Sequence, residues 1–447
     1  MTTVAETAMT EPTIRRSSAS MMVCAALFAL ACSSTTSQTP AGGMPGAAQP
    51  RVVTTQSGVT TEGAVAATPA ATPAATPAAG RAGQGGRAGQ GGRGAQGGRG
   101  GGGRGFQGEM DSVRMRQLYV SNDPKDLPSG NFDRDMAAKV RTDSIYAARF
   151  KGIIDFQKIT YKSRADGMEI PAYLFAPMNK RGPKGHAVMI WVHGGVHGNW
   201  TESMLPFVKE AVERGYVIVA PDYRGSTGHG EALHMAIDYG GEEVADVLSA
   251  VDYLKTLPYV DMDRLGMMGW SHGGFITVHN AAAANTPIKA AAAIVPVTNL
   301  IFRLSFKGPG YQRSYAAESS IRGLPFENPD EYIKRSPLYQ VENLHIPLLV
   351  HVATNDLDVN YVEDQQLVWK LRALKPDLAE TKVYVDPAGW GSSVGHAFSR
   401  RVDPVTLERV DSPAQIDSWN RTWTFFDWWL RPYEDRSKPT PTYRVQP

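Results

Sequence analysis

Cysteine is almost absent from this sequence, which contains only Cys24 and Cys32. The chain beyond residue 32 therefore has neither a disulfide nor a catalytic thiol, and its stability depends on a hydrophobic core. Long apolar runs are also missing, because even Met21–Ala31 is too short to span a bilayer. The net charge of +2 is small for 447 residues and does not indicate a strongly basic surface.

Residues 1–32 have the features of an export signal. Arg15 and Arg16 precede the apolar run, which ends in Ala-Leu-Ala-Cys at Cys32. This ending is similar to a bacterial lipoprotein cleavage site, so Cys32 is the residue expected to carry the lipid. The signal predicts export to the bacterial cell envelope and a membrane-anchored lipoprotein in the periplasm or outer membrane.

Residues 33–108 are built from Ala, Pro and Thr and then from Arg and Gly. Such a segment buries too little apolar surface to fold, so we expect a disordered tether with a mean reach of about 50 Å. It holds six arginines against one glutamate, and Phe106 is its only aromatic residue. Arginine-glycine segments can bind RNA through charge and stacking, but the lack of aromatics and the export signal favour a linker. We expect no nucleic-acid partner.

The sequence Gly-Trp-Ser-His-Gly at 269–273 joins a hydrophobic strand, 265–268, to a helix-compatible stretch, 275–284. In this context a G-x-S-x-G turn holds its serine in a strained backbone position with the hydroxyl exposed. A serine that merely lies between glycines in a turn is the alternative interpretation. The adjoining strand and helix favour Ser271 as a nucleophile.

A serine nucleophile needs a histidine base and a carboxylate that orients the base. Of the ten histidines, only His396 follows the candidate acids, and it lies in a glycine-rich loop after the strand-like segment 381–385. A surface histidine is the alternative. Asp356 directly follows the apolar run 346–353 and is our choice for the acid. Asp358 is its competitor.

The reaction also requires N–H donors for the oxyanion. One is the backbone N–H of His272, the residue after the nucleophile. The second is expected from the His-Gly-Gly turn at 193–195 that follows an early apolar strand, where we favour Gly195 over the preceding glycine. His193 and His197 could instead form a metal pair, but no nearby Cys, Asp or Glu completes a ligand set. We expect neither a metal nor a cofactor.

The chain from 156 to 432 alternates strand and helix patterns, which predicts an α/β fold of the α/β-hydrolase type. Its sheet should be mostly parallel and covered on both faces, with a small cap insertion at 300–329. The expected strands are 159–161, 172–176, 188–192, 216–220, 265–268, 290–295, 346–353 and 381–385. The expected helices are 202–214, 242–257, 275–284, 362–374 and 416–430.

Two clusters of side chains have alternative interpretations. The aromatics of 416–430 resemble a carbohydrate platform, but their helical spacing favours core packing. Arg303, Arg313 and Arg322 in the cap could meet a substrate carboxylate, but we interpret them as solvated surface charges. Residues 109–155 are expected to form an N-terminal helical extension and 433–447 a C-terminal tail.

Several motifs together resemble the catalytic domain of the prolyl oligopeptidase family of serine peptidases. They are Trp-Val-His-Gly-Gly at 191–195, Asp-Tyr-Arg-Gly-Ser-Thr-Gly-His-Gly at 222–230, the serine motif, Ser-Pro-Leu-Tyr at 336–339 and Gly-His-Ala-Phe at 395–398. The likeness covers about residues 155 to 430. The resemblance implies that Ser271, Asp356 and His396 are the nucleophile, the acid and the base.

The sequence departs from the family pattern at three points. His272 stands where the family often has tyrosine, and Asp358 where it more often has arginine or asparagine. Residues 109–155 are also too few for even two blades of the propeller found in larger members, since a blade takes about 40 to 45 residues. Without a propeller the site should be more open, so neither a proline preference nor dipeptide release can be carried over.

These observations predict a serine hydrolase that cleaves peptide bonds through an acyl-enzyme on Ser271. A carboxylesterase acting on small or carbohydrate-linked esters is the alternative, because the size filter of a propeller is missing. A catalytically inactive surface-binding protein on a hydrolase scaffold is an alternative of another class.

Overall fold

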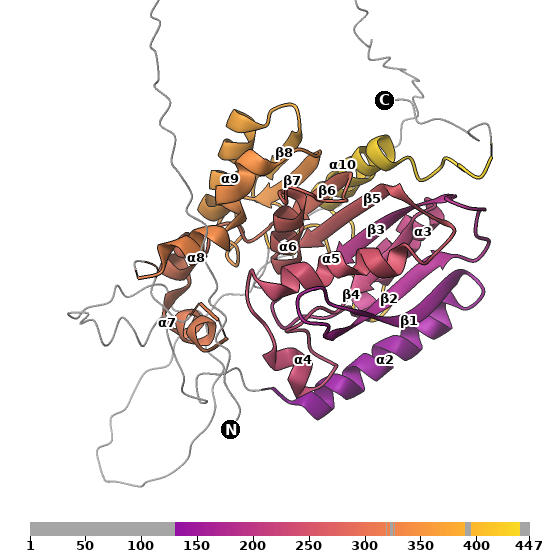
Figure 1. Cartoon of the computed structure of the whole chain (residues 1–447), viewed down its shortest axis with the longest axis horizontal. Helices are drawn as coiled ribbons and strands as arrows, with labels where there is room; N and C mark the ends of the chain where they lie inside the picture. The colour runs from indigo at the N-terminus through magenta and orange to yellow at the C-terminus, as the bar shows by residue number, and fades with distance from the viewer. Residues whose placement is uncertain (1–129, 319, 322–324, 326, 389–394, 439–447) are drawn as a thin grey trace, which may run out of the picture. The chain divides into compact units, whose positions relative to one another are not determined.

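An eight-stranded sheet organises the part of the chain that the computed structural model describes, residues 130–318, 320–321, 325, 327–388 and 395–438. The spatial order of its strands is β1-β2-β4-β3-β5-β6-β7-β8 (Figure 1). The strands are β1 Ile154–Lys162, β2 Glu169–Pro177, β3 His186–Val192, β4 Val217–Pro221, β5 Val260–Trp270, β6 Ala290–Ile294, β7 Leu348–Ala353 and β8 Ala379–Tyr384.

Only one end of this sheet is antiparallel. β1 and β2 form a hairpin around the turn that contains Gly167, and β2 pairs antiparallel with β4. All pairs from β4 to β8 are parallel. Parallel strands are joined by crossover segments, and here most crossovers contain helices that lie on the sheet faces.

The helices alternate with these strands along the chain. The α-helices are α2 Phe132–Phe150, α3 Leu205–Glu213, α4 Glu231–Met235, α5 Glu242–Leu254, α6 His272–Ala281, α7 Leu300–Glu318, α8 Pro329–Lys334, α9 Tyr361–Leu374 and α10 Pro413–Leu430, with 3-10 turns η2 Glu202–Met204 and η3 Pro337–Asn343. None of the described helices is long and apolar enough to cross a membrane.

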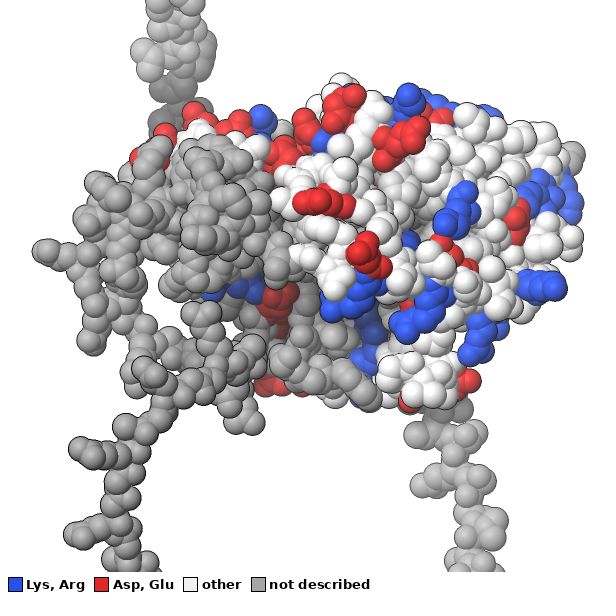
Figure 2. Space-filling model, turned by 90° about the horizontal axis from the view of Figure 1, so that it is seen from below, with Lys and Arg blue, Asp and Glu red and all other residues white. Residues whose placement is uncertain are grey.

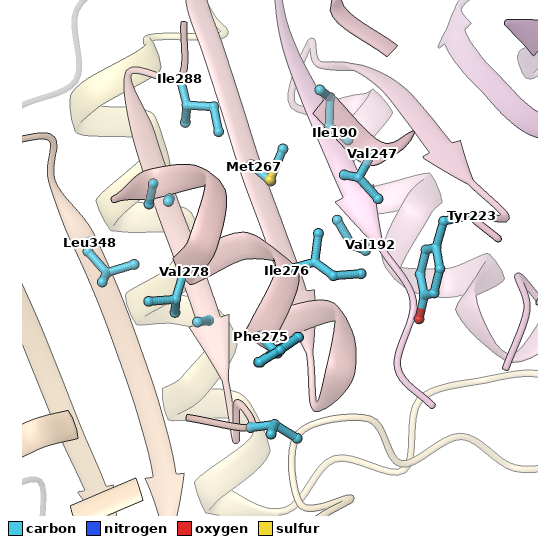
Figure 3. Close-up of a cluster of buried hydrophobic side chains, with 14 of the residues drawn as sticks. Ile190, Val192, Tyr223, Val247, Met267, Phe275, Ile276, Val278, Ile288 and Leu348 are labelled. Carbon is cyan, nitrogen blue, oxygen red and sulfur yellow. The ribbon is translucent and has the colours of Figure 1, made fainter. Parts of the chain in front are cut away.

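Two hydrophobic cores lie on opposite faces of the sheet. Side chains of β3 alternate between them, with Val188, Ile190 and Val192 in one core and Met189 and Trp191 in the other. The first core packs under α5, α6 and α9, as the α6 side chains against the strands in Figure 3 illustrate. The second is covered by α2, α3 and α10. Burial on both faces explains why these strands are continuously apolar in sequence.

The α/β-hydrolase architecture is the one expected, and the expected strands and helices are present with small shifts of their ends. The short helices α4 and α8 were not expected, since neither has a long amphipathic pattern. The expected cap segment contains α7, and α8 begins at its last residue; the two helices lie together at one side of the sheet in Figure 1. The helix α2 lies within the expected N-terminal extension. Residues 433–438 contact the domain, since Tyr433 is buried.

The aromatic residues of α10 divide into two sets. Trp419, Trp423 and Phe425 are buried in the second core, as helical core packing predicts. Trp428 and Trp429 are instead 47% and 46% exposed and line a shallow pocket. The interpretation of the whole set as core is therefore wrong for these last two residues.

Four buried histidines should make the fold sensitive to mild acid. Burial lowers the pKa of His186, His193 and His279 to about 4 and that of His351 to about 3. The unfolded chain binds these protons near pH 6.5, so the free energy of unfolding should fall as the pH drops from 6.5 to 4. Each histidine contributes up to about 1.4 kcal/mol per pH unit.

Urea unfolding between pH 7.5 and 4.5 measures this slope. His351→Asn should reduce it by the contribution of one histidine, while replacement of the exposed His345 by Asn should leave it unchanged. Equal slopes in all three proteins would contradict the expectation.

Candidate active site

Ser271 lies at the junction between β5 and α6, on a backbone that L-residues rarely adopt. Its φ is 55° and its ψ is −120°. Such strain persists only where the surroundings enforce it. A Cβ on Gly269 would lie 2.4 Å from the carbonyl of Gly273, and one on Gly273 would lie 2.4 Å from the Val192 oxygen. The two glycines of the motif are therefore required by close backbone contact around the serine.

The hydroxyl of Ser271 is not used by the helix that it precedes. Serine at a helix N-cap usually accepts a hydrogen bond from an N–H of the first turn. Ser271 makes no such bond, and its side chain is only slightly exposed. Its backbone is anchored, because its N–H donates to Ile294 (3.0 Å) and its carbonyl accepts from Phe275 (2.9 Å). The residue is fixed in place while its hydroxyl remains available.

Asp356 and His396 are brought together by the loops that follow β7 and β8. Nδ1 of His396 lies 2.8 Å from Oδ2 of Asp356. The other carboxylate oxygen accepts the backbone N–H groups of Asp358 (2.8 Å) and Val359 (3.0 Å), and Asp356 is 2% exposed. A Cβ on Gly395 would lie 2.4 Å from the Asp356 nitrogen, so this glycine lets the two loops touch. The acid is therefore rigidly held.

Asp358 contacts the opposite nitrogen of the same imidazole. Its Oδ2 lies 3.3 Å from Nε2 of His396, and its Oδ1 pairs with Lys307. Its carbonyl accepts a hydrogen bond from Arg303 (3.2 Å). Burial acts to raise the pKa of the Asp358 carboxyl, but His396, Arg303 and Lys307 lower it to about 2. The Asp358 carboxylate thus lies against the nitrogen that a triad histidine uses for proton transfer, so it has to move away before that nitrogen can reach a serine hydroxyl.

Arg303 is not the surface charge that we expected from the sequence. It is 5% exposed, donates to the Tyr311 hydroxyl (2.9 Å) and lies 3.5 Å from Glu363. Its partners, Tyr311 on α7 and Glu363 on α9, hold it inside the domain. The sequence around Arg303 does not show these contacts. The side chain of Arg313 and all of Arg322 lie outside the described residues.

The strand that ends at Ser271 and the loop of His396 are linked through the segment that follows His396. Nε1 of Trp270 donates to the Ser399 hydroxyl (2.8 Å), and Nε1 of Trp419 donates to the Ser399 carbonyl (2.8 Å). Trp270 directly precedes Ser271, so this loop is tied to the end of β5. Since β5, β6 and β7 are parallel neighbours, Ser271 and Asp356 also leave the same edge of the sheet.

Of the residues expected around the oxyanion, His272 directly follows Ser271, and Gly194 is the glycine of the turn that lies beside it. His272 is the first residue of α6, where backbone N–H groups have no acceptor within the helix. A Cβ on Gly194 would lie 3.3 Å from Cβ of Ser271, so the glycine turn adjoins the nucleophile. Gly195 has a φ of 78°, and its carbonyl accepts a hydrogen bond from Tyr223 (2.8 Å). The hydrogen bond from Tyr223 thus holds the turn through the carbonyl group of Gly195.

The two histidines considered as a metal pair have other partners. Nε2 of His193 lies 2.9 Å from the Ser226 hydroxyl, and Nδ1 of His197 lies 2.7 Å from the Gly225 carbonyl. No group of three potential ligands suited to a metal ion occurs among the described residues.

Comparisons with known proteins agree with this geometry. Residues 203–401 match the model of the prolyl oligopeptidase family. The chain is 29% identical over 266 residues to the uncharacterized peptidase YuxL of Bacillus subtilis, a match that covers 59% of this chain and 38% of YuxL. It is 30% identical over 237 residues to the acylamino-acid-releasing enzyme of Arabidopsis thaliana, covering 50% of this chain and 30% of that enzyme. Residues 203–401, which hold the serine motif and the histidine loop, are therefore similar to the prolyl oligopeptidase family.

Solved structures show the same fold. An acylaminoacyl peptidase in complex with Z-Gly-Gly-Phe-chloromethyl ketone superposes with a TM-score of 0.52 at 22% identity. The acylaminoacyl peptidase of Pyrococcus horikoshii gives 0.51 at 22% identity, and each match covers 65% of this chain and 44% of that structure. The chain spans less than half the length of these relatives. The described residues before β1 form the single helix α2 and no propeller blade.

A buried ion pair that sequence reasoning missed supports the glycine turn of this domain. Nζ of Lys139, on α2, lies 2.5 Å from Oδ2 of Asp222 and donates to the Trp200 carbonyl (2.9 Å). Oδ1 of Asp222 accepts the Trp200 N–H (2.8 Å), and His229 lies 2.8 Å from Oδ2. Burial acts to raise the pKa of Asp222, but Lys139 and the neighbouring histidines hold it well below its usual range.

This ion pair fixes the chain just beyond the turn. Lys139 and Asp222 bind both backbone groups of Trp200, and Oδ1 of Asp222 lies 3.6 Å from His193, where the turn begins. Lys139, Thr142 and Tyr146 recur at helical spacing and are all buried, and this spacing was the sequence signal for the inner face of α2. It was missed because lysine is rarely buried unless it is paired.

Lys139→Met should destabilise the domain by about 3 to 5 kcal/mol, because it leaves the Asp222 carboxylate buried without its cation. Hydrolytic activity should fall as well, since the turn loses its support. Lys158→Met is the matched control: that lysine is 61% exposed beside Asp143, so its loss should have an effect of about 0 to 1 kcal/mol. Urea unfolding compares the two variants, and similar losses would refute a special role for Lys139.

Proposed function

We propose that this chain is a serine peptidase that works through an acyl-enzyme on Ser271. The supporting observation is a strained, uncapped serine and an oriented Asp356–His396 pair that follow strands at the same edge of the sheet. The Ser271 hydroxyl attacks the amide carbonyl while His396 accepts its proton. The N–H groups of His272 and Gly195 stabilise the resulting oxyanion. Collapse of this intermediate breaks the C–N bond, and His396 gives the proton to the leaving amine.

Hydrolysis of the acyl-enzyme repeats these roles. Water attacks the ester carbonyl, His396 accepts a proton from the water, and Ser271 leaves with that proton as the acid product is released. Asp356 remains ionised and holds the imidazole in the required tautomer. Each cycle needs Nε2 of His396 to be free, so Asp358 has to withdraw before attack.

The names of the relatives favour amide substrates. Two are an acylamino-acid-releasing enzyme and a peptidase, but this chain spans only 30% and 38% of their lengths. The same acyl-transfer chemistry also cleaves esters, so carboxylesterase activity is measured beside peptidase activity. We further propose that the chain is exported and anchored through a lipid on Cys32, on the strength of the signal at residues 1–32. Loss of palmitate labelling in Cys32→Ser would support the anchor, and unchanged labelling would refute it.

A fluorophosphonate probe should label the wild-type protein covalently and leave Ser271→Ala unlabelled, because only an activated serine reacts. Ser226→Ala is a control for another buried serine near a histidine and should still be labelled. Paired p-nitroanilide and p-nitrophenyl ester substrates then separate peptidase from esterase activity. Labelling of Ser271→Ala would contradict the proposal that Ser271 is the nucleophile. A wild-type protein that neither reacts with the probe nor hydrolyses either substrate would indicate a binding protein.

The two aspartates should differ sharply in their effect on turnover. Asp356→Asn should lower kcat by about 10³- to 10⁴-fold, because an amide stabilises the wrong histidine tautomer. Asp358→Asn removes the charged contacts to Nε2 and to Lys307 but leaves the Asp356–His396 hydrogen bond intact, so it should change kcat by about tenfold or less. Steady-state kinetics on a neutral anilide measure both values. A larger fall in kcat for Asp358→Asn than for Asp356→Asn would make Asp358 the residue that orients His396.

A further inference from the structure

Arg400 places a guanidinium beside the candidate nucleophile. It follows His396 by four residues in the loop that leads to α10. Its Nη1 lies 3.6 Å from the point where a Cβ on Gly194 would stand, and Cβ of Ser271 lies 3.3 Å from the same point. The guanidinium also lies 5.8 Å from the ring centre of Trp270. Arg400 therefore approaches Ser271 across the glycine turn.

This guanidinium has no acceptor among the described residues. Its Nε is sealed from solvent and makes no hydrogen bond. By contrast, the buried arginines Arg224 and Arg264 each pair with a carboxylate: Arg224 with Asp246 at 2.7 Å, and Arg264 with Asp261 at 2.9 Å. The nearest acids to Arg400 are already engaged, since Asp356 binds His396 and Asp358 binds Lys307.

Arg400 nevertheless carries its charge at neutral pH. Burial lowers its pKa to about 10, although Asp356 and Asp358 act in the opposite direction. Arg400 is partly exposed as a whole, but its Nε is sealed from solvent. A sealed donor without an acceptor is unfavourable, and such groups in native proteins usually have a ligand or a functional role. Guanidinium has a planar fork of donors that matches a carboxylate with two parallel hydrogen bonds.

We propose that Arg400 binds a carboxylate of the substrate next to the scissile bond. This proposal rests on the proposed serine peptidase function and names the substrate class within it. Because Arg400 and Ser271 flank the same glycine, the carboxylate lies within about one residue length, 3.8 Å along the chain, of the carbonyl that is attacked. It belongs either to the free C-terminus of the leaving residue or to an acidic side chain beside the bond.

Matched substrates separate these two sources. One pair consists of N-acetyl dipeptides that differ in a free or an amidated C-terminus. The other consists of amidated peptides with Glu or Gln beside the cleaved bond. Wild type should prefer the carboxylate member of one pair by about 10- to 100-fold in kcat/KM.

Arg400→Gln should abolish this preference and leave the neutral member within about threefold of wild type, as expected when only a charged hydrogen bond is lost. Arg372→Gln, at an exposed arginine on α9, is the control and should keep the preference. An equal fall on both members of each pair would overturn the proposal, because it would mean that Arg400 acts on the oxyanion or on folding. A wild type without any preference would overturn it too.

Thermal unfolding gives a second readout that does not depend on turnover. Without ligand, Arg400→Gln should melt at or above the wild-type temperature, because it removes an unpaired charge; a drop of several degrees would indicate a structural role and contradict the proposal. N-acetyl dipeptide acids should raise the melting temperature of Ser271→Ala and not that of the double variant with Arg400→Gln.

The two readouts separate failure of the site from failure of the function. Stabilisation by the acids without any hydrolysis by wild type would keep the carboxylate site and reject the peptidase. Hydrolysis of the neutral substrates with no carboxylate effect would reject the site alone.

Discussion

The hydrogen bond between Nδ1 of His396 and Oδ2 of Asp356 is the interaction on which the proposed chemistry depends. It joins loops that follow adjacent strands, and it forms only because Gly395 allows one loop to touch the backbone of the other. With Nδ1 occupied, Nε2 is the nitrogen left for proton transfer. The hydrogen bond between Trp270 and Ser399 ties the loop that carries His396 to β5, the strand that precedes Ser271. The histidine is therefore held relative to both the aspartate and the serine loops.

The parts of this site that sequence could predict are those encoded by local pattern. Continuous apolar runs identified the parallel strands, and the glycines around Ser271 identified a turn that a Cβ would destroy. The choice between Asp356 and Asp358 was not local, because both follow the same strand and both touch the imidazole. Lys139 and Asp222 are separated by 83 positions and meet through tertiary packing alone. No spacing rule connects such residues, and the same holds for Arg400 and Gly194.

The family model matches residues 203–401, yet the glycine turn at 193–195 and part of its support lie outside this range. Lys139 belongs to α2, and its ammonium group lies over the ring of Tyr173 at 4.3 Å. Desolvation of a lysine is unfavourable, but here a carboxylate, a carbonyl and an aromatic face replace its water. The helix α2 is therefore part of the domain's interior, although the catalytic motifs begin well after it.

Charge around His396 links the resting arrangement to substrate binding. Asp358 lies against Nε2 while Lys307 and Arg303 hold it, and Arg400 lies within the electrostatic range of both aspartates. A substrate carboxylate on Arg400 adds a negative charge to this group. Like charges repel, and neutralising Arg400 also removes an attraction that favours Asp358 in its present position. At the proposed site, binding of an acidic substrate would thus weaken the contact between Asp358 and Nε2, so substrate selection and release of the proposed base would be coupled.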